Sequence, residues 1–326
     1  MALVRGGVIV ILAALIVACG SGGASPTPAA SPTGAATATA SAAATATGAP
    51  PPTEAPTGSP VGAVCDNLPA DAEGDLLATI CERGTILVST DPNYAPQSFL
   101  NPDGTFEGFD IDVANAIGER LGVDVQFETP SFDAVVAGSW SGRWDISVGS
   151  VTVTEARLEI LDFTQAYYYT PAQMAVTDDS GITSLDALAG QPICVGSSTT
   201  YQQWIEGELL LVGSPEPATP PEGATAFPLD TDQLCAQAIA SGRDDFEAFL
   251  SSSTTVQAAI NEETPIVTVG DPVFFEALAV AVDKSDADHD ALLAALDEII
   301  GAMHEDGTLS QSSMTWFDGL DLTVAQ

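Results

Sequence analysis

The order of predicted strands and helices limits the fold of this chain more than any other feature. A buried strand is predicted at Thr85–Ser89, and Asp112–Leu121 carries apolar residues at four-residue steps on one helical face. Asp110 and Asp112 lie at the start of that helix, where acidic side chains oppose the helix dipole. Val123–Phe127 is predicted to form the next strand. Alternation of this kind predicts an α/β fold of open sheets with helices on both faces.

A second run of the same kind begins near residue 182, so the folded part suits two lobes. It extends from about residue 63 to 326, which exceeds a typical single domain. The strands predicted in this second run are 191–195, 225–229, 245–250, 266–269 and 278–282, and the helices are 199–210, 231–241 and 287–303.

The N-terminus has the features of an export signal. Residues 1–18 combine Arg5 with an apolar run from Val8 to Ala18 that is too short for a comfortable membrane span. The end of this run, Leu15–Cys19, resembles a bacterial lipobox, which implies a lipoprotein signal peptide and a lipid on Cys19. The alternative is an ordinary signal peptide followed by an incidental cysteine.

The segment 19–62 is predicted to be a disordered tether. After Cys19 it consists almost entirely of Ala, Thr, Ser, Pro and Gly, and Glu54 is its only charged residue. Such a segment has too little apolar bulk to offset its ordering entropy. We therefore expect an extracytoplasmic protein, anchored to the outer face of the cell membrane through Cys19, with a short N-terminal segment 63–83 before the first lobe.

Four cysteines follow Cys19, and an even number in an exported protein suggests two disulfides. Three pairings are possible. Local closure favours Cys65–Cys81 with Cys194–Cys235, and free buried thiols are the alternative.

Neither a metal site nor a cofactor is expected. The chain has no Cys-x-x-Cys motif and no cluster of histidine and cysteine. His289 and His304 are isolated residues in a predicted helical region, and such histidines are more often surface residues than metal ligands.

One arginine stands out against the charge of the chain. With 7 Lys+Arg and 45 Asp+Glu, the formal net charge is −38. A carboxylate ligand would be repelled by that field unless a cation were placed for it. Arg157 ends the stretch 149–157, and its planar guanidinium can meet a carboxylate with two parallel hydrogen bonds. The alternative is a solvated surface arginine.

Several motifs together resemble the extracellular solute-binding proteins of polar amino-acid transporters (family 3). They follow one another in the family's order across about residues 84 to 320. The segments that carry the resemblance are 90–96, 108–113, 150–157, 162–168, 182–190, 306–308 and 316–317.

The resemblance implies a two-lobed, periplasmic-binding-protein-like (type II) fold. Lobe one would comprise 84–174 and 279–326, lobe two would comprise 175–278, and two crossover strands would join them. The ligand would lie in the cleft between the lobes. The expected partners are a small-molecule ligand and the membrane subunits of an ABC importer. We expect a monomer without enzymatic activity and without a nucleic-acid partner.

The resemblance also assigns residues to the head group of the ligand. Arg157 would hold the α-carboxylate. Thr199 and Thr200 begin a helix, so their N–H groups would form a second anion site on the other lobe, although plain N-capping also explains them. The loop before Arg157 would add Gly149, Ser150 and Thr152.

Three further residues would surround the ligand side chain. Tyr94 and Phe132 match positions that sandwich it, and core packing is the alternative for both. Asp91 matches a position near a polar or basic side-chain end. A turn residue before Pro92 is the alternative for Asp91.

One departure from the family concerns the α-ammonium group. The family usually places an aspartate at the end of the strand that follows Gly242-Arg243. In this chain Leu250 or Ser251 takes that position, so the carboxylate is absent. Glu247 is a nearby candidate, and the serine hydroxyl is an uncharged one. The sequence therefore supports the carboxylate end of the ligand better than its amine end.

Three functions fit these features. The first is a lipid-anchored solute-binding protein for an amino acid or a related small polar carboxylate. The second is a dehydratase of the same superfamily that acts on a cyclic carboxylic acid of the prephenate or arogenate type, with Glu247 as the nearest candidate acid. The third is a ligand-sensing module that works with a separate partner.

Overall fold

The computed structural model describes residues 63–285 and 287–325. The predicted signal peptide (1–18), Cys19 and the tether (19–62) lie outside the described residues. None of the helices in the described part is both long and apolar enough to cross a membrane.

Two sheets form the framework of the described residues. The larger has nine strands in the order β5-β1-β6-β12-β7-β10-β8-β9, with β11 paired to β7, and the smaller has the order β2-β3-β4. The strands of the larger sheet are β1 (Thr85–Ser89), β5 (Asp124–Glu128), β6 (Ile146–Thr152), β7 (Leu161–Thr177), β8 (Pro192–Gly196), β9 (Thr225–Leu229), β10 (Ala248–Ser252), β11 (Ile266–Thr268) and β12 (Phe274–Asp283). Those of the smaller sheet are β2 (Asn93–Tyr94), β3 (Ser98–Leu100) and β4 (Phe106–Glu107).

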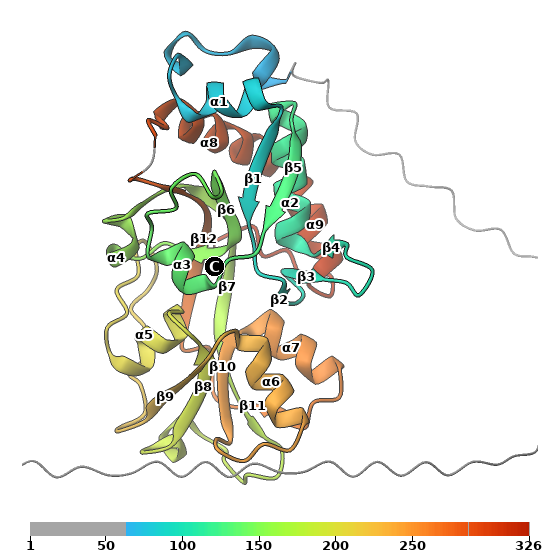
Figure 1. Ribbon diagram of the computed structural model, residues 1–326. Helices are drawn as coiled ribbons and strands as arrows, with labels where there is room; N and C mark the ends of the chain where they lie inside the picture. Colours follow the sequence, from blue (N-terminus) through green and yellow to red (C-terminus); the bar gives the residue numbers. More distant parts are fainter. Residues whose placement is uncertain (1–62, 286, 326) are drawn as a thin grey trace, which may run out of the picture. The chain divides into compact units, whose positions relative to one another are not determined.

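Strands β7 and β12 join two lobes, which Figure 1 shows one above the other. These strands pair antiparallel from Phe274 to Asp283. In lobe one, β1 runs parallel to both β5 and β6. In lobe two, β8 runs parallel to both β9 and β10. The result confirms the predicted α/β fold with two lobes and two crossover strands.

Helices cover the sheet in both lobes. Helix α2 begins at Phe109, three residues before the predicted start, and its first turn includes the buried Phe109 and Asp110. Helix α5 ends at Glu206 rather than at 210, because Gly207 adopts a left-handed conformation there. The helices are α1 (Leu76–Arg83), α2 (Phe109–Leu121), α3 (Phe132–Val136), α4 (Glu155–Leu158), α5 (Thr200–Glu206), α6 (Asp232–Ala240), α7 (Ser253–Asn261), α8 (Asp290–Glu305) and α9 (Thr308–Trp316).

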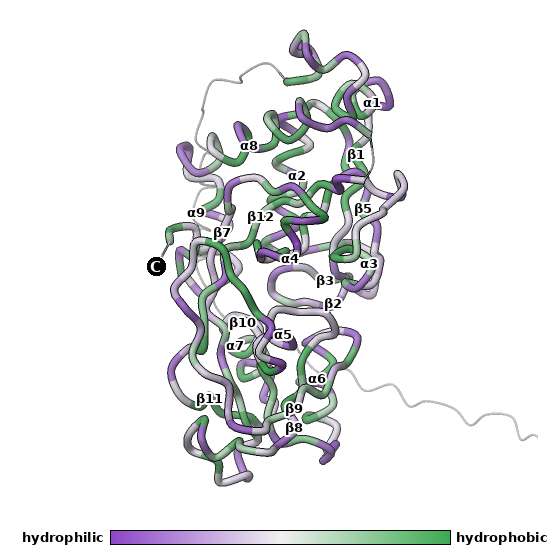
Figure 2. Tube along the Cα trace, turned by 90° about the vertical axis from the view of Figure 1, so that its left-hand side faces the viewer, coloured by the Kyte–Doolittle hydropathy of each residue, from purple (hydrophilic) through white to green (hydrophobic). Residues whose placement is uncertain are grey.

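Each lobe has its own hydrophobic core. The core of lobe one packs α2 and α8 against β1 and β6, and the cores of lobe two lie around β8 and β10. Hydrophobic and hydrophilic residues alternate along α8 in Figure 2, as expected for a helix with one buried face. Separate cores allow the lobes to move as units about β7 and β12.

Gly108 brings the segment that follows β1 close to α2. Its φ is 129°, and an added Cβ would lie 2.3 Å from the carbonyl oxygen of Gln97. Only glycine accepts this backbone conformation and this close approach. The loop that carries Tyr94 and Gln97 is therefore packed directly on the start of α2.

Both disulfides have the pairing that local closure favours. Cys65–Cys81 ties the N-terminal segment to α1, and Cys194–Cys235 ties β8 to α6. The second bridge fixes the first turn of α6 against the end of β8.

Candidate functional site

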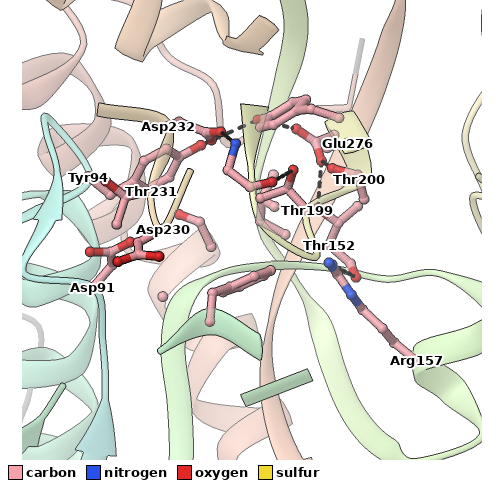
Figure 3. A pocket seen from close by; sticks show the side chains of 16 residues that line it. Asp91, Tyr94, Thr152, Arg157, Thr199, Thr200, Asp230, Thr231, Asp232 and Glu276 are labelled. Atoms are coloured by element: carbon pink, nitrogen blue, oxygen red, sulfur yellow. Dashed lines mark hydrogen bonds between the residues drawn. The ribbon is translucent and has the colours of Figure 1, made fainter. Parts of the chain in front are cut away.

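A cavity lies where the two lobes meet. All nine residues that the sequence predicts as ligand-binding line it, so the structure brings the whole predicted set together. The predicted residues are Asp91, Tyr94, Phe132, Gly149, Ser150, Thr152, Arg157, Thr199 and Thr200. The remaining lining residues are Gly196, Tyr201, Asp230, Thr231, Asp232, Glu276 and Leu278 (Figure 3).

The lining residues come from loops and helix starts at strand ends. Lobe one supplies the end of β6, the loop after β1, and helices α3 and α4. Lobe two supplies the starts of α5 and α6, and the crossover strand β12 supplies Glu276 and Leu278. This placement follows the rule that open α/β sheets bind ligands at the carboxyl ends of their strands.

Arg157 is buried in the cavity wall rather than solvated. Its side chain is 3% exposed, and its Nη1 donates to the carbonyl oxygen of Thr152 at 3.0 Å. Its Nη2 donates across the lobes to the carbonyl oxygen of Ser198 at 3.1 Å. The Nε–H has no hydrogen-bond partner among the described residues. The surface-arginine alternative is therefore wrong, and the guanidinium keeps a donor free.

Burial lowers the pKa of Arg157 to about 10, while the charge of Glu276 acts in the opposite direction. The guanidinium therefore stays positively charged at neutral pH. Its Cζ also lies 5.1 Å from the ring centroid of Phe132, within the range of a cation–π contact.

The start of α5 shows the capping role that the sequence left open. The hydroxyl of Thr199 accepts from the backbone N of Gln202 at 3.3 Å and donates to the carbonyl oxygen of Gly196 at 2.7 Å. The hydroxyl of Thr200 donates to Glu276. A ligand contact by either threonine stays a prediction that is compatible with capping.

Glu276 is a buried carboxylate that sequence reasoning missed. Its side chain is held by three hydroxyls: those of Thr152 at 2.6 Å, Thr200, and Tyr201 at 2.7 Å. Burial raises the pKa of Glu276, while the three hydroxyls and the nearby Arg157 counteract that increase. The only signal for it in the sequence is a single glutamate within the otherwise apolar run of β12.

Asp232 is the second missed carboxylate, in the first turn of α6. One of its oxygens accepts from the backbone N of Gly196, and the other accepts from the hydroxyl of Ser251 at 3.2 Å. The side chain is buried, and that burial raises its pKa to about 8. In the sequence it looks like an ordinary acidic residue at a helix start.

The contacts of Asp232 bear on the predicted position of the α-ammonium group, for which the sequence offered Glu247 and Ser251. Glu247 is exposed and does not line the cavity, so it was the wrong candidate. Ser251 lies at the strand end as expected, but its hydroxyl donates to Asp232. A carboxylate is thus present beside the expected position, supplied by a different element.

The residues predicted around the ligand side chain also have contacts of their own. The hydroxyls of Tyr94 and Tyr201 lie 3.3 Å apart across the lobes. Asp91 accepts from the backbone N of Asn93 at 2.7 Å, which is the turn contact that the alternative reading expects. Asp91 therefore stabilises a turn and lines the cavity as well.

Polar side chains around the cavity hold the two lobes together. Gln97 is fully buried, and its Nε2 donates to the hydroxyls of Ser252 at 3.0 Å and Thr254 at 2.7 Å. The side-chain amide of Asn93 donates to the hydroxyl of Thr231 at 3.0 Å. The described form is therefore one in which the lobes are in contact around the cavity.

Proteins similar in sequence to this chain include amino-acid-binding proteins. The L-cystine-binding protein TcyJ of Escherichia coli (strain K12) is 29% identical over 255 residues, covering 77% of this chain and 89% of that protein. A probable amino-acid ABC transporter-binding protein of Haemophilus influenzae is 25% identical over 260 residues, covering 77% of this chain and 91% of that protein.

Solved structures show the same fold. The ancestral amino acid-binding protein AncCDT-1, a precursor of cyclohexadienyl dehydratase, has a TM-score of 0.63 at 27% identity, covering 74% of this chain and 100% of that one. An ancestral arginine-binding protein bound to glutamine has a TM-score of 0.62 at 27% identity, covering 72% of this chain and 98% of that one.

A sequence model of a whole family matches most of the folded part. It describes the bacterial extracellular solute-binding proteins, family 3, and it matches residues 86–319. The match includes both lobes, both crossover strands and every residue that lines the cavity. This chain belongs to the bacterial extracellular solute-binding proteins, family 3.

Proposed function

We propose that this protein captures an amino acid or a related small polar carboxylate outside the cell and delivers it to an ABC importer. The observation that carries the proposal is the buried Arg157, which lines the cavity between the lobes and keeps one N–H donor free. A buried cation with a free donor suits an anionic ligand group.

In the proposed complex the ligand carboxylate lies against Arg157. The loop of Gly149, Ser150 and Thr152 adds polar groups from lobe one, and the start of α5 adds groups from lobe two. A head group held from both lobes favours the closed form, because it makes contacts there that an open form lacks. Tyr94 and Phe132 would enclose the side chain, with Asp91 near its end.

Calorimetry of the full-length chain against the common L-amino acids and L-cystine tests this proposal. The expected result is saturable binding of one or a few of them at a stoichiometry of one. Failure of the folded protein to bind any of them would contradict it.

The anchoring of the protein is a separate proposal. The resemblance of Leu15–Cys19 to a lipobox supports a lipid on Cys19, which would keep the protein at the outer face of the membrane. Cys19→Ala should release the protein from the membrane fraction and abolish labelling by a radioactive fatty acid. Unchanged labelling would contradict the anchor.

A dehydratase is the second candidate, and Glu276 is the observation that favours it. A buried carboxyl with a raised pKa, beside an arginine in the cavity between the lobes, has the properties of a general acid. It replaces Glu247 in that role. Formation of phenylpyruvate from prephenate by the wild type, lost in Glu276→Gln, would support this candidate over pure binding.

A further inference from the structure

We propose that Asp232 binds the ammonium group of the ligand, so that the cavity selects ammonium carboxylates over plain carboxylates. This inference rests on the proposed function. Figure 3 shows Asp232 and Arg157 at different sides of the cavity, where they can hold two ends of one head group.

Among the described residues, four carboxyl groups line the cavity, and they differ in burial and in the charges near them. Asp230 is exposed, and Asp91 is only partly buried, with one oxygen occupied by the backbone N of Asn93. Glu276 accepts from three hydroxyls and is attracted by Arg157. Asp232 is buried as well, but both of its hydrogen-bond donors are uncharged, and the charges that act on it are those of Glu276 and Asp91.

Asp232 is buried without a compensating cation. Its side chain is 5% exposed, and no Lys, Arg or His of the described residues forms an ion pair with it. The charges of Glu276 and Asp91 disfavour its ionised form further. A buried carboxylate of this kind is costly unless a positive group pairs with it. A ligand ammonium would supply that group.

The position of the carboxyl group is set before any ligand arrives. The backbone N of Gly196 and the hydroxyl of Ser251 each donate to one of its oxygens. A Cβ at Gly196 would lie 2.7 Å from Asp232 Oδ1, so this residue must be glycine for the carboxyl group to sit there. The disulfide Cys194–Cys235 ties the strand and the helix that carry these groups. Preorganisation of this kind reduces the entropy cost of binding.

Matched pairs of ligands that differ only in the α-ammonium group test the proposal. The pairs are L-glutamine with glutaramate and L-arginine with 5-guanidinopentanoate, titrated by calorimetry into the full-length chain. In at least one pair, the wild type should bind the amino acid at least about tenfold more tightly than the analogue that lacks the ammonium group. The reason is that the ammonium forms a charge-assisted contact. In Asp232→Asn that ratio should fall to within about threefold.

Two variants separate Asp232 from other carboxyl groups. Glu247→Gln removes one negative charge from an exposed site on the same lobe, outside the cavity, and should keep the wild-type ratio. Glu276→Gln removes the other buried carboxyl group of the cavity, and loss of the preference in this variant alone would assign the ammonium group to Glu276. Circular dichroism checks folding of each variant, and Asp232→Ser provides the same comparison if Asp232→Asn does not fold.

The outcomes distinguish this inference from the proposed function. Equal binding of both members of a pair by the wild type would overturn the role of Asp232 and leave a carboxylate-binding protein. An unchanged ratio in Asp232→Asn, or loss of the ratio in Glu276→Gln alone, would overturn it as well. Binding of no amino acid by the folded wild type would overturn both.

Discussion

At the scale of single residues, the cavity combines one cation with carboxyl groups that the interior does not neutralise. Arg157 is the only Lys or Arg that lines it among the described residues. Asp232 and Glu276 are buried there, and burial raises the pKa of each carboxyl. Such an arrangement lowers the stability of the ligand-free protein. A positively charged ligand group that pairs with these carboxyl groups would therefore bind favourably.

The first prediction concerns the stability of Asp232→Asn. The pKa of Asp232 in the folded protein, about 8, lies above the ordinary value of 3.8. Its favourable contribution to the free energy of unfolding is therefore complete below about pH 3.8 and is lost as the pH rises toward 8. Asparagine does not titrate. The melting temperature of the ligand-free variant, relative to wild type, should therefore be higher at pH 9 than at pH 5.

Differential scanning calorimetry of both proteins without ligand measures this. A variant that is less stable than wild type by the same amount at both pH values would show that Asp232 has only a structural role.

At the scale of secondary-structure elements, the junction of β8 and α6 positions the second charged group of the cavity. The disulfide Cys194–Cys235 and the bond from the backbone N of Gly196 to Asp232 tie β8 to the first turn of α6, which Thr231 caps. A substitution in this junction should therefore change ligand affinity by moving Asp232, even where the substituted side chain does not touch the ligand.

The second prediction is that Gly196→Ala weakens binding of the best L-amino acid by roughly tenfold or more, a cost of about 1.4 kcal/mol or above. The added Cβ would meet Asp232 Oδ1 at 2.7 Å and Thr199 Cγ2 at 3.0 Å, so both must move. Gly301→Ala in α8 is the control, since its Cβ would meet only the flexible end of Gln165, at 3.2 Å. Equal affinities for the two variants would refute the proposed junction.

Elements also show what the sequence could and could not predict. The predicted ligand-binding residues lie in short motifs at the ends of strands. In an open α/β fold these strand ends meet at one cleft, so the fold predicts that the residues come together there. Asp110 was predicted as an acidic residue that opposes the dipole of α2. It lies in the first turn of α2 as predicted, but it is also buried and accepts from the hydroxyls of Ser150 at 2.7 Å and Tyr167 at 2.8 Å, which the sequence did not indicate.

The missed carboxyl groups share one cause. The donors that make burial tolerable for Asp232 and Glu276 come from distant segments, such as Ser251 and Thr152. No local pattern reveals a partner that is supplied by another strand. Periodicity and capping rules therefore predict the elements, but not which polar side chains turn inward.

At the scale of the whole molecule, the distribution of positive charge sets Arg157 apart. In the described part of the chain, Arg83, Arg120, Arg243 and Lys284 each pair with an aspartate. Neither Arg143 nor Arg157 forms an ion pair among the described residues, but Arg143 is exposed whereas Arg157 is buried. In a chain with a net charge of −38, a buried cation at the cavity between the lobes is a site to which an anionic group would bind.

The third prediction concerns contact between the lobes. Gln97 from lobe one reaches Ser252 and Thr254 in lobe two, and the hydroxyl of Thr255 donates to its Oε1 at 3.4 Å. Gln97→Ala removes these contacts and should shift the ligand-free protein toward an open form. Small-angle X-ray scattering should give a larger radius of gyration than for wild type, and saturating ligand should restore the compact value.

Gln126→Ala is the matched control, because the exposed Gln126 bonds only locally, to Glu128 at 2.9 Å. Identical scattering from the Gln97 and Gln126 variants would mean that these contacts do not hold the lobes.

The central claim is that Arg157 binds the carboxylate of the ligand. The most direct measurement compares L-glutamine with L-glutaminamide, and L-arginine with L-argininamide, by calorimetry in the wild type and in Arg157→Ala. The wild type should bind the carboxylate of the responsive pair roughly ten- to hundredfold more tightly than the amide, since a charge-assisted hydrogen bond contributes about 1.5–3 kcal/mol. Arg157→Ala should bind both weakly and nearly equally. A folded Arg157→Ala that keeps wild-type affinity for the amino acid would contradict the account.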